Sequence, residues 1–130
     1  MVEFDGVNFG LFVLIWLVQV IIYPSFHKID NSCFVDWHSQ YTKSISFFVV
    51  PLMTAQIILA IMLGLKSGFN FWLNTQICLI AVIWLATFAG AVPCHKILFS
   101  GKDFAVINRL IRINWIRTIL WTIVSLIDLF

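Results

Sequence analysis

Charged residues are scarce in this chain of 130 residues: they make up 11% of it, against 62% hydrophobic residues. Soluble domains carry about 25% charged and roughly 45–50% apolar residues, so the composition excludes a soluble globular domain. The eight Lys and Arg residues form no exposed basic surface that could follow a phosphate backbone. We therefore expect an integral membrane protein whose partner is the lipid bilayer, and no nucleic-acid partner.

Cysteines, glycines and histidines are also few, and their positions exclude several classes of site. Three cysteines cannot form a disulfide framework, and the chain has no glycine-rich phosphate loop and no nucleophile elbow. It lacks the H-x-x-x-H and E-x-x-H spacings of zinc proteases and di-iron bundles. The sequence therefore identifies no cofactor, and a bound metal stays an open alternative that is taken up below.

Long hydrophobic runs, in contrast, fill most of the chain. About 20 apolar residues cross a bilayer, so 130 residues accommodate four crossings with short connections. We expect an all-α, antiparallel four-helix bundle that forms a single transmembrane domain over residues 1–130. The expected spans are 9–25, 42–65, 71–93 and 105–129.

Prolines and acidic residues mark the expected ends of these spans. Pro24 and Pro93 are each expected to end or kink a helix, and Pro51 to bend the second span. Asp36 is the predicted N-cap of the second span, and Asp103 that of the fourth. The first span lacks the basic start and the small-residue cleavage site of a signal sequence, so we expect it to be retained.

Basic residues gather at one end of the predicted bundle. That end holds six of the eight: Lys28, Lys43, Lys96, Lys102, Arg109 and Arg112. The opposite end holds Lys66 beside Glu3, Asp5 and Asp128. The positive-inside rule makes the basic end cytoplasmic and places both termini on the non-cytoplasmic side. We expect the plasma (inner) membrane of a bacterium.

One charge, Arg117, lies inside a predicted span, with Asn114 one turn before it. On insertion scales, a charge at mid-span costs about 2.5–3.5 kcal/mol of free energy. The other spans should therefore provide polar partners for Arg117. The sequence leaves open whether Arg117 joins a structural network with Gln19, Gln56 or Thr87, reaches the surface, or holds an anionic or carbonyl-bearing ligand. The residues expected to bind such a ligand are Arg117, Asn114, Tyr41, Gln19, Gln56, Tyr23 and Trp121.

The predicted topology brings His27, His38 and His95 to the basic end. His95 and His38 are the candidates for catalysis, as proton donor or acceptor. Imidazoles from three connections can also form a metal site with His27, His38 and His95 as ligands. Alternatively, the histidines are interfacial residues at helix ends. All three interpretations stay open.

Two segments carry a resemblance to known proteins: Val92-Pro93-Cys94-His95, and Asn114-Trp115-Ile116-Arg117-Thr118 with Trp121. They resemble a pattern in small four-span bacterial membrane proteins of unknown function and, more remotely, in the anthrone-oxygenase-like four-span family. This resemblance implies a four-helix bundle with oxygenase-like or quinone-type chemistry, at positions His95, Asn114 and Arg117. Where His95 stands, the remote family more usually has an amide.

These observations favour a small membrane protein with a polar site near the cytoplasmic leaflet, which binds or transforms a lipophilic molecule that has a polar head. Arg117 and Asn114 would hold that head. One alternative is a subunit of a homo-oligomeric channel or transporter, in which the helix face of Asn114, Arg117 and Ser125 lines a pathway. Another is an accessory membrane subunit without catalysis. The sequence does not decide whether the protein is an enzyme.

Overall fold

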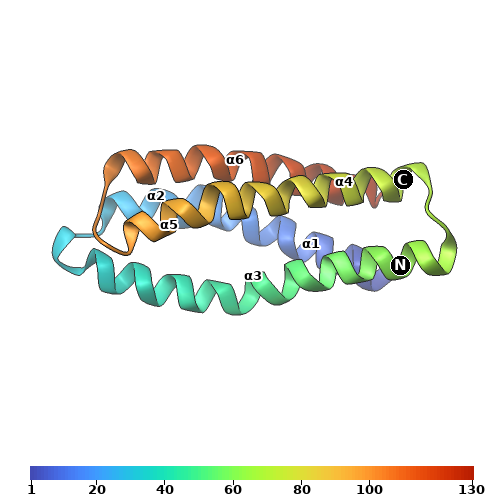
Figure 1. Cartoon of the computed structure of the whole chain (residues 1–130), viewed down its shortest axis with the longest axis horizontal. Coiled ribbons are helices and arrows are strands. Elements are labelled where there is room, and N and C mark those ends of the chain that lie inside the picture. The colour runs from blue at the N-terminus through green and yellow to red at the C-terminus, as the bar shows by residue number, and fades with distance from the viewer.

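The computed structural model describes all 130 residues, and it contains helices and no strands. Four helical rods are long and apolar enough to cross a membrane: Val2–Lys28, Asn31–Ser67, Phe71–Leu98 and Phe104–Ile127. Figure 1 shows them side by side along the horizontal long axis, with both termini and the turn at 68–70 at the right-hand end of the molecule. The predicted all-α membrane-spanning four-helix bundle is confirmed.

The first and third rods continue through their prolines. The first consists of α1 (Val2–Leu17), η1 (Val18–Ile22), α2 (Tyr23–Ser25) and η2 (Phe26–Lys28), and the third of α4 (Phe71–Ala86), η3 (Thr87–Ala91) and α5 (Val92–Leu98). Both η1 and η3 are π-helical, and each ends two residues before a proline, Pro24 or Pro93. The wider π turn makes room for a proline ring and its missing N–H. The helices therefore continue past the expected span ends at 25 and 93.

The second rod is one helix, α3 (Asn31–Ser67), of 37 residues. At about 1.5 Å per residue it is longer than a hydrocarbon layer of about 30 Å. Its N-cap is Asp30, which accepts a hydrogen bond from the Ser32 backbone N–H at 2.8 Å, and this bond holds the pKa of Asp30 below its ordinary value. The prediction of Asp36 as the cap and of a start near 42 was wrong, because residues 31–41 are already helical.

The fourth rod, α6 (Phe104–Ile127), begins as predicted. Asp103 caps it by accepting hydrogen bonds from the backbone N–H groups of Ala105 and Val106 at 2.9 and 3.2 Å. α6 packs against both α1 and α4, whereas α3 packs chiefly against α1. At Gly90, η3 comes so close to α6 that an added Cβ would lie 2.7 Å from Cγ2 of Ile113.

Buried apolar side chains form two separate clusters along the bundle. The cluster toward the termini contains Leu11, Ile80, Trp121 and Val124 among others. The cluster toward the opposite end, where residues 29–30 and 99–103 connect the rods, contains Phe26, Phe34, Leu98 and Leu110 among others. The members of both clusters named here are 0–1% exposed.

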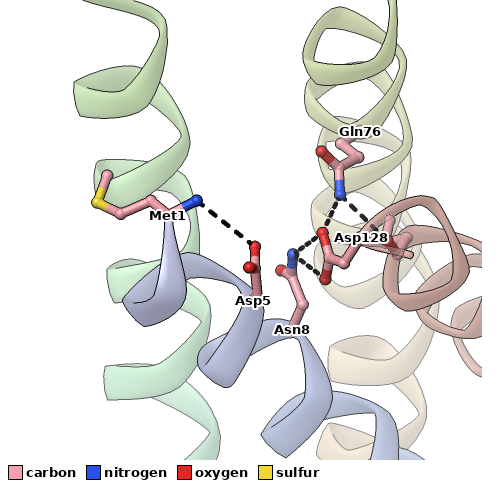
Figure 2. A network of polar contacts seen from close by, with 6 residues as sticks. Met1, Asp5, Asn8, Gln76 and Asp128 are labelled. Atoms are coloured by element: carbon pink, nitrogen blue, oxygen red, sulfur yellow. Dashed lines mark hydrogen bonds and ion pairs between the residues drawn. The ribbon is translucent and has the colours of Figure 1, made fainter. Parts of the chain in front are cut away.

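A hydrogen-bonded network ties the rods together near the termini. The Asp128 carboxylate accepts from Asn8 Nδ2 at 2.9 and 3.2 Å and from Gln76 Nε2 at 2.6 Å, as Figure 2 shows. Asn8 Oδ1 in turn accepts from Gln56 Nε2 of α3 at 2.7 Å. Burial raises the pKa of Asp128 above its ordinary value of 3.8, and the bonds from Asn8 and Gln76 act in the opposite direction.

We expect Asp128→Asn to remove one contribution to the pH dependence of stability. Because the pKa of Asp128 is raised by folding, the folded state binds a proton more readily than the unfolded chain. The contribution of Asp128 to the free energy of unfolding therefore falls as pH rises from 3.8 through the raised pKa. The midpoint of thermal unfolding in detergent, measured for both proteins from about pH 3 to about pH 7, should fall in the wild type relative to Asp128→Asn as the pH approaches neutral.

Asp5→Asn is the matched control for this experiment. Asp5 lies at the same end of the bundle, 3.9 Å from the N-terminal amine, as Figure 2 shows, but outside the network of Asn8 and Gln76. The charge of Asp5 is a minor cause of the raised pKa of Asp128, so Asp5→Asn should keep most of the wild-type pH dependence. A difference between the wild type and Asp128→Asn that stays constant over the whole interval would contradict the assignment to Asp128.

Candidate functional site

Arg117 lies in the interior of the bundle with 5% of its surface exposed. Its Nη1 donates to Asn114 Oδ1 at 3.3 Å, and its guanidinium carbon lies 5.1 Å from the ring centroid of Trp121. The only ion pair in the chain joins the N-terminus to Asp5, so Arg117 has no carboxylate partner, and its Nε has no hydrogen-bond partner. The alternative in which Arg117 reaches the surface is wrong.

Gln19 holds Asn114 in place below the guanidinium. Its Oε1 accepts from Asn114 Nδ2 at 2.9 Å and from Thr118 Oγ1 at 3.1 Å, and its Nε2 donates to the Ile111 carbonyl at 3.4 Å. Gln19 belongs to η1, one of the two π-helical turns. The predicted partnership of Gln19 with Arg117 therefore exists in an indirect form, through Asn114.

The other two predicted partners of Arg117 form hydrogen bonds elsewhere. Thr87 Oγ1 donates to the Ile83 carbonyl at 2.8 Å. Gln56 Nε2 donates to Asn8, and Gln56 Oε1 accepts from Trp121 Nε1 at 3.2 Å. Gln56 thus fixes the indole that lies beside the guanidinium, and it does not line the cavity described below.

Tyr23, His95 and His38 form a chain of hydrogen bonds. Tyr23 Oη lies 3.2 Å from His95 Nε2, and His95 Nδ1 lies 2.9 Å from His38 Nε2. The two imidazole rings stack with their centroids 5.1 Å apart. His38 is fully buried, and its Nδ1 has no hydrogen-bond partner. Residues from α2, α5 and α3 are thus connected through atoms that can carry protons.

His27 lies apart from this chain. Its Nε2 forms a hydrogen bond of 2.8 Å with Asn108 Oδ1, and its ring stacks on Phe104 with centroids 4.9 Å apart. No three His, Cys, Asp or Glu side chains are arranged to hold a metal ion. Of the three histidines considered as metal ligands, the structure brings His38 and His95 together and places His27 on Asn108.

A cavity of about 220 Å³ lies between the two apolar clusters, bounded by residues of both. Of the 18 residues that line it, 14 are hydrophobic. Five predicted site residues are among them: Tyr23, Tyr41, His95, Arg117 and Trp121. Four others, Asn114, Gln19, Gln56 and His38, do not line the cavity and lie behind those that do. The structure therefore gathers the predicted site around one cavity.

The sequence-based prediction missed the wall that the third rod contributes. Trp84, Phe88 and Ala91 line the cavity and are spaced by four and three residues, followed four residues later by His95. This spacing defines one face of a helix. It could have been found by following the helical period back from His95.

Comparisons of the chain with protein-family models, with curated proteins and with solved structures find no match. The remote resemblance to the anthrone-oxygenase-like family therefore stays a prediction. Because a four-helix bundle hosts many unrelated functions, the function has to be argued from the side chains around the cavity.

We expect Gln19→Leu to destabilise the protein. The substitution introduces an apolar side chain of similar size and leaves the fully buried Asn114 amide without its acceptor, whereas Thr118 keeps the Asn114 backbone carbonyl as an acceptor. An unsatisfied buried polar group costs about 1–3 kcal/mol. Chemical or thermal unfolding in detergent should show a loss within that range.

Gln40→Leu provides the control for the chemical change alone. Gln40 is exposed on α3, and its side chain forms no hydrogen bond within the protein. Its substitution should therefore leave the unfolding midpoint nearly unchanged. If the two variants are equally stable, Gln19 does not hold the network around Asn114.

Proposed function

We propose that the protein binds a lipophilic molecule through an oxygen-bearing head, anionic or carbonyl, and that Arg117 holds this head in the cavity. The supporting observation is a buried guanidinium that lines the cavity and has only neutral partners. Two opposite charges about 4 Å apart attract by about 4 kcal/mol at an effective dielectric constant near 20. A hydrogen bond between neutral groups contributes only about 1 kcal/mol, so the site favours an anion or a strong dipole.

The size and lining of the cavity suit a head no larger than one substituted ring. An apolar cavity of about 150 Å³ is large enough for benzene, and this cavity measures about 220 Å³. Aromatic rings line it on several sides: Tyr23, Tyr41, Trp84, Phe88 and Trp121. They offer apolar faces to the ligand, while Arg117 and His95 provide the polar contacts that orient it.

The chain Tyr23–His95–His38 gives the bound head a route for protons. When Tyr23 donates to His95 and His95 to His38, a proton released by the head onto the Tyr23 oxygen displaces one along each bond. The last proton stays on His38, which then carries hydrogen on both ring nitrogens, and the reverse sequence returns a proton to the head. Arg117 therefore binds in this proposal, and His95 and His38 transfer protons.

We further propose that the end with residues 29–30 and 99–103 faces the cytoplasm, and that both termini lie on the non-cytoplasmic side of a bacterial plasma (inner) membrane. Six of the eight basic residues support this orientation by the positive-inside rule. His38 lies toward this end, with the ring of Phe99 5.0 Å from its own.

The contacts of Asn114, Arg117 and Ser125 weigh against the channel or transporter alternative. That alternative needs their helix face to line a pathway between subunits. Asn114 and Arg117 are buried within a single bundle, and Ser125 Oγ donates to the Asn8 carbonyl at 3.0 Å. An accessory subunit without catalysis is the remaining alternative, and it is favoured if the following experiment fails.

We expect the purified wild-type protein to carry a lipophilic molecule that Arg117→Gln loses. Glutamine can bond to Asn114 but removes the positive charge, so an acidic or carbonyl head would bind at least about tenfold more weakly, which corresponds to about 1.4 kcal/mol. Untargeted mass spectrometry of molecules extracted from both proteins, purified in the same detergent, measures the difference.

Arg112→Gln is the matched control, because Arg112 lies on the same helix but is exposed. This variant should retain the molecule. Thermal unfolding of all three proteins separates the two roles of Arg117: a molecule lost while the fold persists supports binding. If Arg117→Gln loses only stability, and no molecule distinguishes it from the wild type, the role of Arg117 is structural.

We expect Tyr23→Phe to retain the bound molecule but to change the imidazole nitrogen resonances of His95. Phenylalanine preserves the ring beside the cavity and removes only the hydroxyl that lies 3.2 Å from His95 Nε2. Nitrogen-detected NMR of protein labelled in histidine measures the effect. Tyr41→Phe is the control, since Tyr41 lines the cavity and forms no hydrogen bond with a histidine. Equal spectra for the two variants would argue against the relay.

A further inference from the structure

We propose that the ligand reaches the cavity sideways from the bilayer, through an opening between α3 and η3. We also infer its class: an amphiphile with one long apolar tail, which stays in the opening while its oxygen-bearing head contacts Arg117. This inference rests on the proposed function and adds the route and the overall shape of the ligand.

The exposed residues of the cavity wall locate the opening. Val50 of α3 and Phe88 of η3 line the cavity and are also 57% and 61% exposed, and Ser46, one turn before Val50, is exposed as well. The lining residues of the first rod and of α6 are buried or half-buried, including Ile15 and Arg117. The cavity is thus closed on the side of α1 and α6 and meets the outer surface between α3 and η3.

Tightly packed residues block the two ends of the cavity along the bundle axis. Toward the termini, the floor is made by Met53 and Trp121, which are 3% and 1% exposed. Toward the opposite end, Tyr23 is 3% exposed, and Phe26 packs against it with ring centroids 5.3 Å apart. A molecule dissolved in either aqueous phase would have to displace these side chains, whereas one in the hydrocarbon meets the opening directly.

The packing of α3 explains why the opening lies where it does. α3 packs chiefly against α1 and only sparsely against the third rod, and Figure 1 shows it bowed along its length. Pro51, adjacent to Val50, lies inside this helix, and a proline removes a backbone hydrogen bond and favours such bending.

The size and the single charge of the cavity define the ligand class. Sites for drug-sized ligands measure about 300–1,000 Å³, so a cavity of about 220 Å³ holds a head and leaves a tail outside. A headgroup with several charges would be desolvated at a free-energy cost of several kcal/mol per ion, and only one guanidinium is present to offset it. Single-tailed carboxylates and tailed phenols or quinones share the required chemistry.

Photoreactive single-tailed amphiphiles, one a carboxylate and one a phenol, test this inference in the full-length protein in lipid vesicles. One probe has a carboxylate head and the other a phenol head, and both carry a diazirine midway along the same tail. We expect at least one probe to label the peptides that contain Val50 and Phe88, about tenfold more than in Arg117→Gln. The head of the more efficient probe identifies the favoured kind of ligand.

Val50→Trp should narrow the opening and reduce this labelling, and Val50→Ala should preserve or increase it. Val20→Trp is the matched control, because Val20 is 58% exposed, like Val50, but does not line the cavity. It should label like the wild type.

Two contrary results are distinguishable. Labelling that depends on Arg117 but falls on residues 29–30 and 99–103, with Val50→Trp behaving like Val20→Trp, would overturn sideways access and leave the proposed function standing. Labelling that is the same in the wild type and in Arg117→Gln at every residue would overturn the proposed function itself.

Discussion

The structure depends on how a positive charge is kept inside a bundle that offers it no negative partner. Arg117 is held by one amide, Asn114, and by the face of one indole, Trp121. A cation over an aromatic ring contributes about 2 kcal/mol when both are desolvated, and insertion of the charge costs about 2.5–3.5 kcal/mol. The favourable free energy of the cation–aromatic contact and the free-energy cost of inserting the charge are of similar size. An anionic head in the adjacent cavity would therefore add a further favourable interaction with Arg117.

The two π-helical turns connect this constraint to the backbone. A proline in a regular helix would break the hydrogen-bond ladder within the membrane, where water cannot replace the lost partner. η1 and η3 relieve both prolines and carry site residues themselves: Gln19 in η1, and Thr87 and Phe88 in η3. Tyr23 and His95 follow within four residues of a π turn. The irregular turns are thus the segments from which both walls of the site are built.

Hydropathy and helical spacing predicted the bundle, the position of Arg117 and Asn114 inside a span, and the arrival of Tyr23 and His95 at one end of it, because these depend on periodicity and topology alone. They failed where two local solutions were chemically equivalent. Asp30 and Asp36 can both cap a helix, and the polar stretch 31–40 suits a loop as well as a helix that projects beyond the hydrocarbon. The hydrogen-bond partners of Gln56 could not be predicted either, because a buried amide can bond to any polar group nearby. In the structure these groups are Asn8 and Trp121.

The network at the termini also determines how the site is built, because its hydrogen bonds have a direction. A carboxylate only accepts, so Asp128 requires the NH₂ of Asn8, and the oxygen of Asn8 must then face the NH₂ of Gln56. The oxygen of Gln56 is left for an indole N–H, which only donates and which Trp121 provides. Every member is therefore satisfied in a single orientation. The charge of Asp128 thereby fixes the ring on which Arg117 rests, through two amides and without any contact between the two ions.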